Sequence, residues 1–105
     1  MNGVRHFLDI ADLSTMDVRA ILDTARAMKG RRGTDAAAED RLLSHKNVAL
    51  VFEQPSLRTR MSFEVGVNDL GGSPIMVTGK EIELGEREAI KDTARVLSRY
   101  VDAIM

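Results

Sequence analysis

The chain has 105 residues, which corresponds to one domain or to part of one. Its 15 Lys and Arg residues face 16 Asp and Glu residues, and the net charge of −1 argues against binding nucleic acid through a general basic field. Hydrophobic residues make up 44% of the chain and charged residues 30%, a composition typical of a globular rather than a disordered protein.

Residue types exclude several further classes of site. The absence of cysteine rules out disulfides, thiolate metal ligands and cysteine nucleophiles. His6 and His45 are far apart in the sequence and predict no metal site. Residues 1–10 lack the apolar core of a secretory signal, and no apolar run approaches the roughly 18–20 residues that span a bilayer. We therefore expect a cytoplasmic protein with no metal, nucleic-acid or membrane partner.

The first third of the chain predicts one amphipathic helix. Apolar residues recur at helical spacing over residues 14–29. Ser14 is a candidate N-cap, Asp17 stands three residues later as in a capping box, and Gly30 is a natural stop. The charged, small residues 31–40 then predict a loop.

The middle of the chain predicts a strand followed by a helix. Residues 47–52 include a continuous apolar run, typical of a strand buried on both faces in a parallel sheet. Residues 58–70 predict a helix with Met61 and Val65 facing inward, and two glycines at 71–72 end it.

The last third predicts a second buried strand at 74–77, a polar loop at 78–85, a third helix at 86–100 and a third strand at 101–105. This alternation of helices and strands favours an α/β fold with a parallel sheet and crossover helices. Since the last predicted strand reaches the final residue, we expect residues 1–105 to be the N-terminal domain of a longer chain, incomplete at its C-terminal end.

The segment that follows the first predicted strand carries the strongest functional signal. Ligands of α/β sheets bind beyond the carboxyl ends of strands, where a helix N-terminus offers free N–H groups. Ser56 and Thr59 add hydroxyls there, and Arg58 and Arg60 add two guanidinium groups, which together suit a phosphate. The alternative is that Ser56 is only an N-cap and the arginines form a solvated face, with Arg60 paired to Glu64 four residues on.

Two other phosphate-binding motifs are absent. Lys80 follows a glycine but precedes Glu81, and Pro74 stands where a Walker-type loop needs its first glycine. No G-x-G-x-x-G sequence follows a predicted strand, so the dinucleotide fingerprint is missing too.

The run from Ser56 to Glu64, Ser-Leu-Arg-Thr-Arg-Met-Ser-Phe-Glu, resembles the carbamoyl-phosphate signature of the aspartate/ornithine carbamoyltransferases. Residues 6–9 resemble the N-terminal start of the ornithine enzymes. Residues 84–88, 92–99 and 102–104 resemble the ornithine branch rather than the aspartate branch. The resemblance covers nearly the whole chain.

This resemblance implies a two-domain transcarbamoylase whose N-terminal α/β domain binds carbamoyl phosphate and whose C-terminal domain binds the amino acid. The active site would lie between the domains and between subunits of a homotrimer. The δ-amine of ornithine would attack the carbamoyl carbon, giving citrulline and phosphate, with no metal or organic cofactor. The isolated 105-residue chain would then be inactive.

By the same resemblance, the side chains of Ser56, Arg58 and Thr59 would hold the phosphate, and the backbone N–H of Leu57 would contribute. Arg58 would be the catalytic residue, polarising the carbamoyl group and stabilising the charge that grows on the leaving phosphate.

Two positions depart from the family pattern. Leu57 stands where threonine is frequent, which matters little if only its backbone takes part. Glu83 stands where the ornithine enzymes have a glutamine that reaches the neighbouring subunit's phosphate, and a carboxylate would repel that phosphate. Either this loop is displaced, or it is aligned incorrectly, or another residue such as Lys80 takes the role. An aspartate-type domain and a non-catalytic phosphate-binding module are the alternatives.

Overall fold

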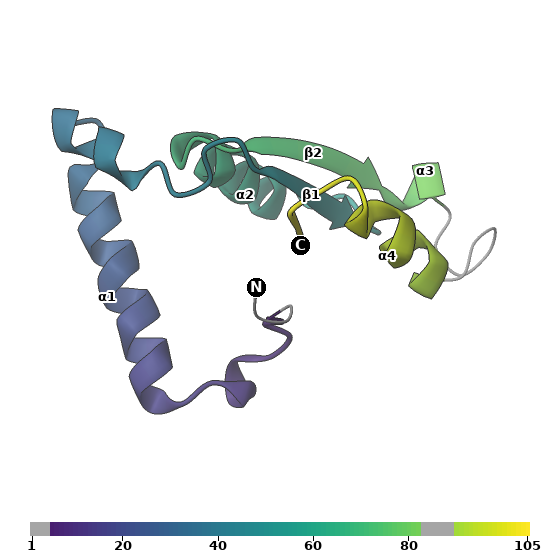
Figure 1. Ribbon diagram of the computed structural model, residues 1–105, viewed down its shortest axis with the longest axis horizontal. Helices are drawn as coiled ribbons and strands as arrows, with labels where there is room; N and C mark the ends of the chain where they lie inside the picture. Colours follow the sequence, from purple (N-terminus) through teal and green to yellow (C-terminus); the bar gives the residue numbers. More distant parts are fainter. Residues whose placement is uncertain (1–4, 83–89) are drawn as a thin grey trace. The chain divides into compact units, whose positions relative to one another are not determined.

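The computed structural model describes residues 5–82 and 90–105. The chain divides into two compact units, Met1–Ala37 and Ala38–Met105, which are described separately below. The first unit holds the long helix α1, and the second holds the sheet with helices α2, α3 and α4 (Figure 1).

Helix α1 spans Thr15–Arg31 and begins as predicted. The Ser14 hydroxyl accepts a hydrogen bond of 3.0 Å from the backbone N–H of Asp17, which satisfies one of the free donors of the first turn. The predicted stop at Gly30 is wrong, because the helix continues to Arg31 and the left-handed glycine is Gly33, with φ of 80°.

Two short 3₁₀ helices flank α1, namely η1 at Ile10–Asp12 and η2 at Asp35–Asp40. The loop predicted for residues 31–40 is therefore only partly correct. Small and acidic residues can form such short helices locally, without an apolar periodicity that a sequence pattern would reveal.

The sheet confirms the predicted parallel α/β architecture. Strand β1, Asn47–Phe52, lies between β2, Ser73–Thr78, and β3, Ala103–Ile104, and both pairings are parallel. Phe52 and Thr78 are register partners, so β1 and β2 end side by side at the same edge of the sheet.

Strand β1 forms the centre of the core. Val48, Ala49 and Leu50 are buried, as predicted for a strand covered on both faces. Strand β2 is less buried than predicted: Val77 is buried but Ile75 is 44% exposed, because β2 has a hydrogen-bonded neighbour on one side only within the described sheet.

Helix α2 spans Leu57–Asp69 and packs on β1 and β2 through Val67. The predicted inward residues are wrong, since Met61 is 45% and Val65 37% exposed. Apolar residues lie on more than one side of this helix, and only the direction in which it crosses the strands selects the packed side.

The paired glycines end α2 as predicted. Gly71 has a φ of 86°, its N–H donates to the Asn68 carbonyl, and the N–H of Gly72 donates to the Val67 carbonyl. These two bonds form a Schellman motif, which turns the chain from the helix into β2.

The connection from β2 to β3 contains two helices, α3 at Gly79–Ile82 and α4 at Ile90–Ser98. The predicted loop at 78–85 is thus wrong over its described part, because Thr78 ends β2 and residues 79–82 are helical; residues 83–85 lie outside the described residues. The helix predicted for 86–100 runs two residues past the observed end of α4 at Ser98, and residues 86–89 of that prediction lie outside the described residues.

The two crossovers run in opposite directions, since β2 and β3 lie on opposite sides of β1. Right-handed crossovers therefore place α2 and α4 on opposite faces of the sheet, and in Figure 1 α2 lies behind the strands and α4 in front of them. The loops leaving β1 and β2 consequently diverge, and a crevice forms where they separate.

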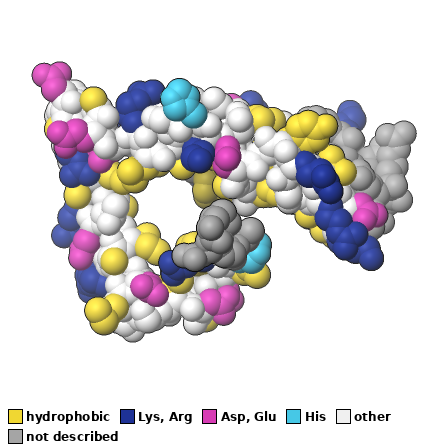
Figure 2. All heavy atoms as spheres, in the orientation of Figure 1, with side chains coloured by type: hydrophobic (Ala, Val, Ile, Leu, Met, Phe, Trp, Pro, Cys, Tyr) yellow, Lys and Arg dark blue, Asp and Glu magenta, His cyan; other side chains and the backbone are white. Residues whose placement is uncertain are grey.

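The surface of the second unit mixes charged and apolar side chains. Figure 2 shows hydrophobic side chains beside Lys and Arg side chains over α4, where Ile90 and Val96 are exposed. Within the part of the chain that the structure describes, no helix is long and apolar enough to cross a membrane.

Candidate phosphate-binding site

A hollow of about 470 Å³ lies where the loops after β1 and β2 diverge. Its walls come from the end of β1, the loop into α2, the first turn of α2, the end of β2 and the start of α3. The lining residues are Phe52, Glu53, Gln54, Pro55, Ser56, Leu57, Arg60, Met76, Thr78, Gly79 and Lys80.

The first turn of α2 carries free backbone donors at this hollow. The first bond of the helix runs from the N–H of Arg60 to the Ser56 carbonyl. Among the described residues, the N–H groups of Leu57, Arg58 and Thr59 therefore have no acceptor, and the Ser56 hydroxyl does not cap any of them. Three free N–H groups and the positive end of a 13-residue helix provide the elements of an anion site.

Two cations and one carboxylate line the hollow, namely Arg60, Lys80 and Glu53. Arg60 faces it because residues three apart lie on the same side of a helix, and Leu57 is also a lining residue. The Arg60 Nε atom lies 3.8 Å from Glu64 Oε2, which confirms the predicted pairing. This pair is half-exposed and leaves the guanidinium within reach of the hollow.

The predicted site residues divide into two groups. Ser56 and Leu57 line the hollow, whereas Arg58 and Thr59 lie on the same first turn of α2 but are not lining residues. Their phosphate-binding role, and the catalytic role of Arg58, stay predictions. Glu83, the residue expected to act on a neighbouring subunit, lies outside the described residues.

The end of β2 also contributes to the hollow, which was not predicted from the sequence. Thr78 and Gly79 line the hollow because Thr78 pairs with Phe52, which brings the two strand ends together. A Cβ atom on Gly79 would lie 3.0 Å from Glu53 Cα and 3.1 Å from its carbonyl oxygen. A glycine two residues after the strand predicted at 74–77 was the available signal for this close approach.

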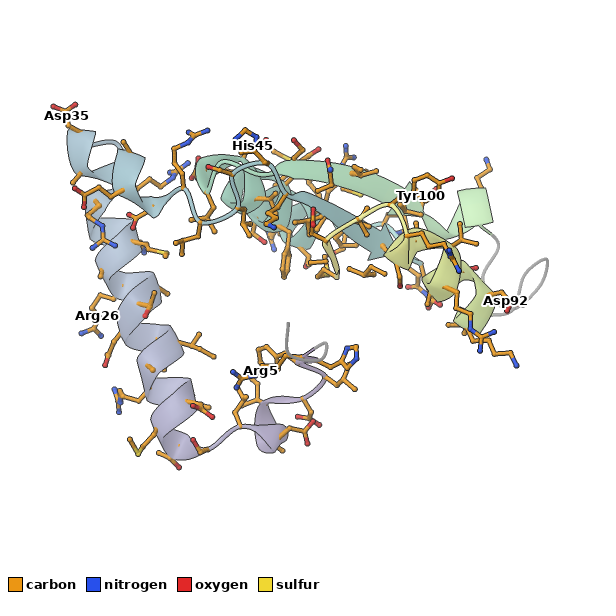
Figure 3. The ribbon with its side chains drawn as sticks, viewed as in Figure 1. Arg5, Arg26, Asp35, His45, Asp92 and Tyr100 are labelled. Atoms are coloured by element: carbon orange, nitrogen blue, oxygen red, sulfur yellow. The ribbon has the colours of Figure 1, made fainter. Side chains whose placement is uncertain are left out.

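The opposite edge of the sheet has a different character. His45 lies in the turn before β1, away from α3 (Figure 3). At this edge the Asn47 N–H donates to Asp102 Oδ2 at 2.8 Å, and the Asp102 N–H donates to the Asn47 carbonyl at 2.9 Å. Backbone donors are satisfied internally here, in contrast to the first turn of α2.

A parallel sheet with free donors beyond its carboxyl edge defines the class of α/β domains that bind anionic ligands. Residues 5–105 match the family model described as the aspartate/ornithine carbamoyltransferase, carbamoyl-P binding domain. The chain belongs to this family.

Curated and solved relatives agree on this family. The chain is 55% identical over 101 residues to an ornithine carbamoyltransferase of Nitrobacter winogradskyi, covering 96% of this chain and 32% of that protein. It also resembles the solved structure of ornithine carbamoyltransferase from Pyrococcus furiosus, with 43% identity and a TM-score of 0.86 over 96% of this chain and 32% of that one. The catalytic subunit of M. jannaschii aspartate transcarbamoylase is more distant, with 35% identity and a TM-score of 0.76 over 96% of this chain and 33% of that one.

The chain therefore spans about a third of the length of these relatives. Their names identify the family of this chain as a family of carbamoyl-transferring enzymes, and the fold and the motif from Ser56 to Glu64 agree with that assignment.

Proposed function

We propose that this chain is the carbamoyl-phosphate-binding part of an ornithine carbamoyltransferase, acting together with the two thirds of sequence that its relatives carry beyond the matched region. The proposed reaction transfers a carbamoyl group from carbamoyl phosphate to the δ-amine of L-ornithine, and it forms L-citrulline and phosphate. This chain would supply the site for the phosphate end of the donor substrate.

One observation carries the proposal: the first turn of α2 presents three free N–H groups at a hollow beyond the carboxyl edge of the sheet, and the hydroxyl of Ser56 does not cap them. A dianionic phosphate would accept from these donors and be stabilised by the positive end of the helix. The Arg58 guanidinium, on the same turn, would add a forked pair of donors.

The same groups would act on the chemical step. As the ornithine nitrogen forms its bond to the carbamoyl carbon, the bond from that carbon to the phosphate oxygen breaks, and the phosphate leaves with the electron pair. The amine loses a proton in the process. Donors that already hold the phosphate are better matched to its increased charge in the transition state, which lowers the barrier.

Ornithine is preferred over aspartate as the proposed acceptor because curated relatives named ornithine carbamoyltransferase are 50–55% identical to this chain, whereas the solved M. jannaschii aspartate enzyme is 35% identical. The acceptor would be bound by the part of the protein beyond residues 5–105. We further propose a homotrimer, a place in arginine metabolism and a cytoplasmic compartment.

The test is an assay of the full protein with carbamoyl phosphate and either ornithine or aspartate, together with calorimetric titration of carbamoyl phosphate. We expect saturable binding of carbamoyl phosphate. We expect carbamoyl transfer to ornithine, which gives citrulline, and no transfer to aspartate. Carbamoylation of aspartate would assign the aspartate branch instead. Binding without transfer to either amine would favour a non-catalytic phosphate-binding module, and light scattering would test the trimer.

A further inference from the structure

We infer that Lys80 binds the phosphoryl group of the substrate from within the same chain, opposite the first turn of α2. This inference rests on the proposed function and adds a binding residue on the β2 side of the hollow. The family signature at Ser56 to Glu64 does not include Lys80, and the sequence suggested Lys80 only as a substitute for Glu83 toward a neighbouring subunit, not toward the site of its own chain.

Strand pairing fixes the place of Lys80. Phe52 and Thr78 are register partners, both line the hollow, and the residues directly after each of them line it as well. Gly79 lies so close to Glu53 that any side chain on it would meet Glu53 backbone atoms at 3.0–3.1 Å. The main chain next to Lys80 is therefore held against the loop after β1, and the side chain of Lys80 is attached at the rim of the hollow.

The charge balance of the hollow depends on Lys80. Arg60 and Lys80 are its two lining cations and Glu53 is its lining carboxylate. Arg60 is already 3.8 Å from Glu64, so part of its charge is neutralised. Within the described part of the chain, the Lys80 ammonium has neither an ion pair nor a hydrogen bond, which leaves its three donors available to an anion.

Apolar walls make this charge more effective. Phe52, Pro55, Leu57 and Met76 line the same hollow and reduce the water that can screen a bound phosphate from the cations. A lysine acts on phosphate as a point charge and needs no fixed fork geometry, so an exposed, flexible Lys80 can follow the phosphate as it leaves.

The experiment compares Lys80→Gln with Lys46→Gln in the full protein by calorimetric titration of inorganic phosphate and of carbamoyl phosphate. Lys46 is a matched control, because it is an exposed lysine of the same unit and lies before β1, outside the hollow. We expect Lys80→Gln to weaken both affinities by about tenfold, as for loss of one charge-assisted contact. Lys46→Gln should change them by less than about twofold.

Lys80→Arg keeps the charge and should retain most of the affinity, which separates lost charge from a folding defect. If Lys80→Gln binds both ligands like the unmodified protein, the inference about Lys80 is overturned while the proposed function stands. A loss confined to carbamoyl phosphate also overturns it, because the contact would then be with the carbamoyl end. If the unmodified protein binds neither ligand, the proposed function fails and the inference fails with it.

Discussion

Helices α1 and α2 both begin after a serine, yet the two N-termini differ. Ser14 has φ and ψ of −71° and 161°, and its hydroxyl accepts from the Asp17 N–H. Ser56 has φ and ψ of −151° and 90° and caps nothing. The first serine satisfies one donor in the first turn of its helix, whereas the second leaves its own hydroxyl and three backbone N–H groups free at a hollow.

The comparison shows that a serine at an N-cap position does not always cap its helix, and the two serines differ in their backbone angles. The N–H of Asn47 at the other edge of the sheet resembles that of Asp17, because the Asp102 carboxylate accepts from it internally. Of these three places, the first turn of α2 is the one that combines a hollow with three free N–H groups and a free serine hydroxyl.

The largest expected effect follows from removing the cation of the α2 turn. In the full protein, Arg58→Ala should lower kcat about 10²–10³-fold, equivalent to roughly 3–4 kcal/mol of lost transition-state stabilisation, as for other oxyanion donors. Steady-state kinetics with carbamoyl phosphate as the varied substrate measures this loss.

Arg58→Lys is the matched variant, and it should also be impaired because a point charge cannot replace a planar fork. A kinetic profile that barely changes in both variants would contradict the role of Arg58. It would then restrict the site to the residues that line the hollow.

Two glycines are packed too closely for a side chain, one at the hollow and one in the core, and they distinguish the two regions. Gly79→Ala places a Cβ 3.0 Å from Glu53 Cα, and Gly72→Ala places one 2.9 Å from Leu43 Cβ. Each should destabilise the protein by about 1–3 kcal/mol through overpacking, measured by denaturant unfolding. Only Gly79→Ala should also weaken phosphate binding, since it displaces the rim of the hollow; equal effects on binding would argue against a role of that rim.

The elements could be predicted wherever a local pattern decides them. The capping serine of α1, the apolar run of β1 and the paired glycines after α2 all act within a few residues, and the structure confirms them. The packed side of α2 could not be predicted in this way. Val67 rather than Met61 meets the core, because the crossing of the helix over β1 and β2 selects the buried side.

The site was predicted from one strand end only. The residues after β1 were found because they follow a buried strand and begin a helix, but Thr78 and Gly79 join them through the pairing of β1 with β2. Such a contact joins segments more than twenty residues apart, and it depends on strand register, which no local pattern specifies.

A smaller effect is expected at the opposite edge of the sheet, where the N–H of Asn47 already has an acceptor. Asp102→Ala removes the carboxylate that accepts from the Asn47 N–H at 2.8 Å. We expect a loss of about 1.5 kcal/mol in the free energy of unfolding, the lower end for a hydrogen bond to a charged group. Phosphate affinity should be unchanged, and a weakened affinity would mean that this edge communicates with the hollow.

The two serines provide the most direct test and the smallest energies. Ser14→Ala should reduce the free energy of unfolding by about 1 kcal/mol, because the Asp17 N–H loses its acceptor. Ser56→Ala should leave it within about 0.5 kcal/mol, since no cap bond is lost, but it should weaken phosphate binding several-fold. Chemical unfolding and phosphate titration of both variants measure the two quantities side by side. If Ser56→Ala were the more destabilising variant and bound phosphate normally, Ser56 would be a structural cap. The phosphate site would then consist of the backbone N–H groups of α2 without the Ser56 hydroxyl.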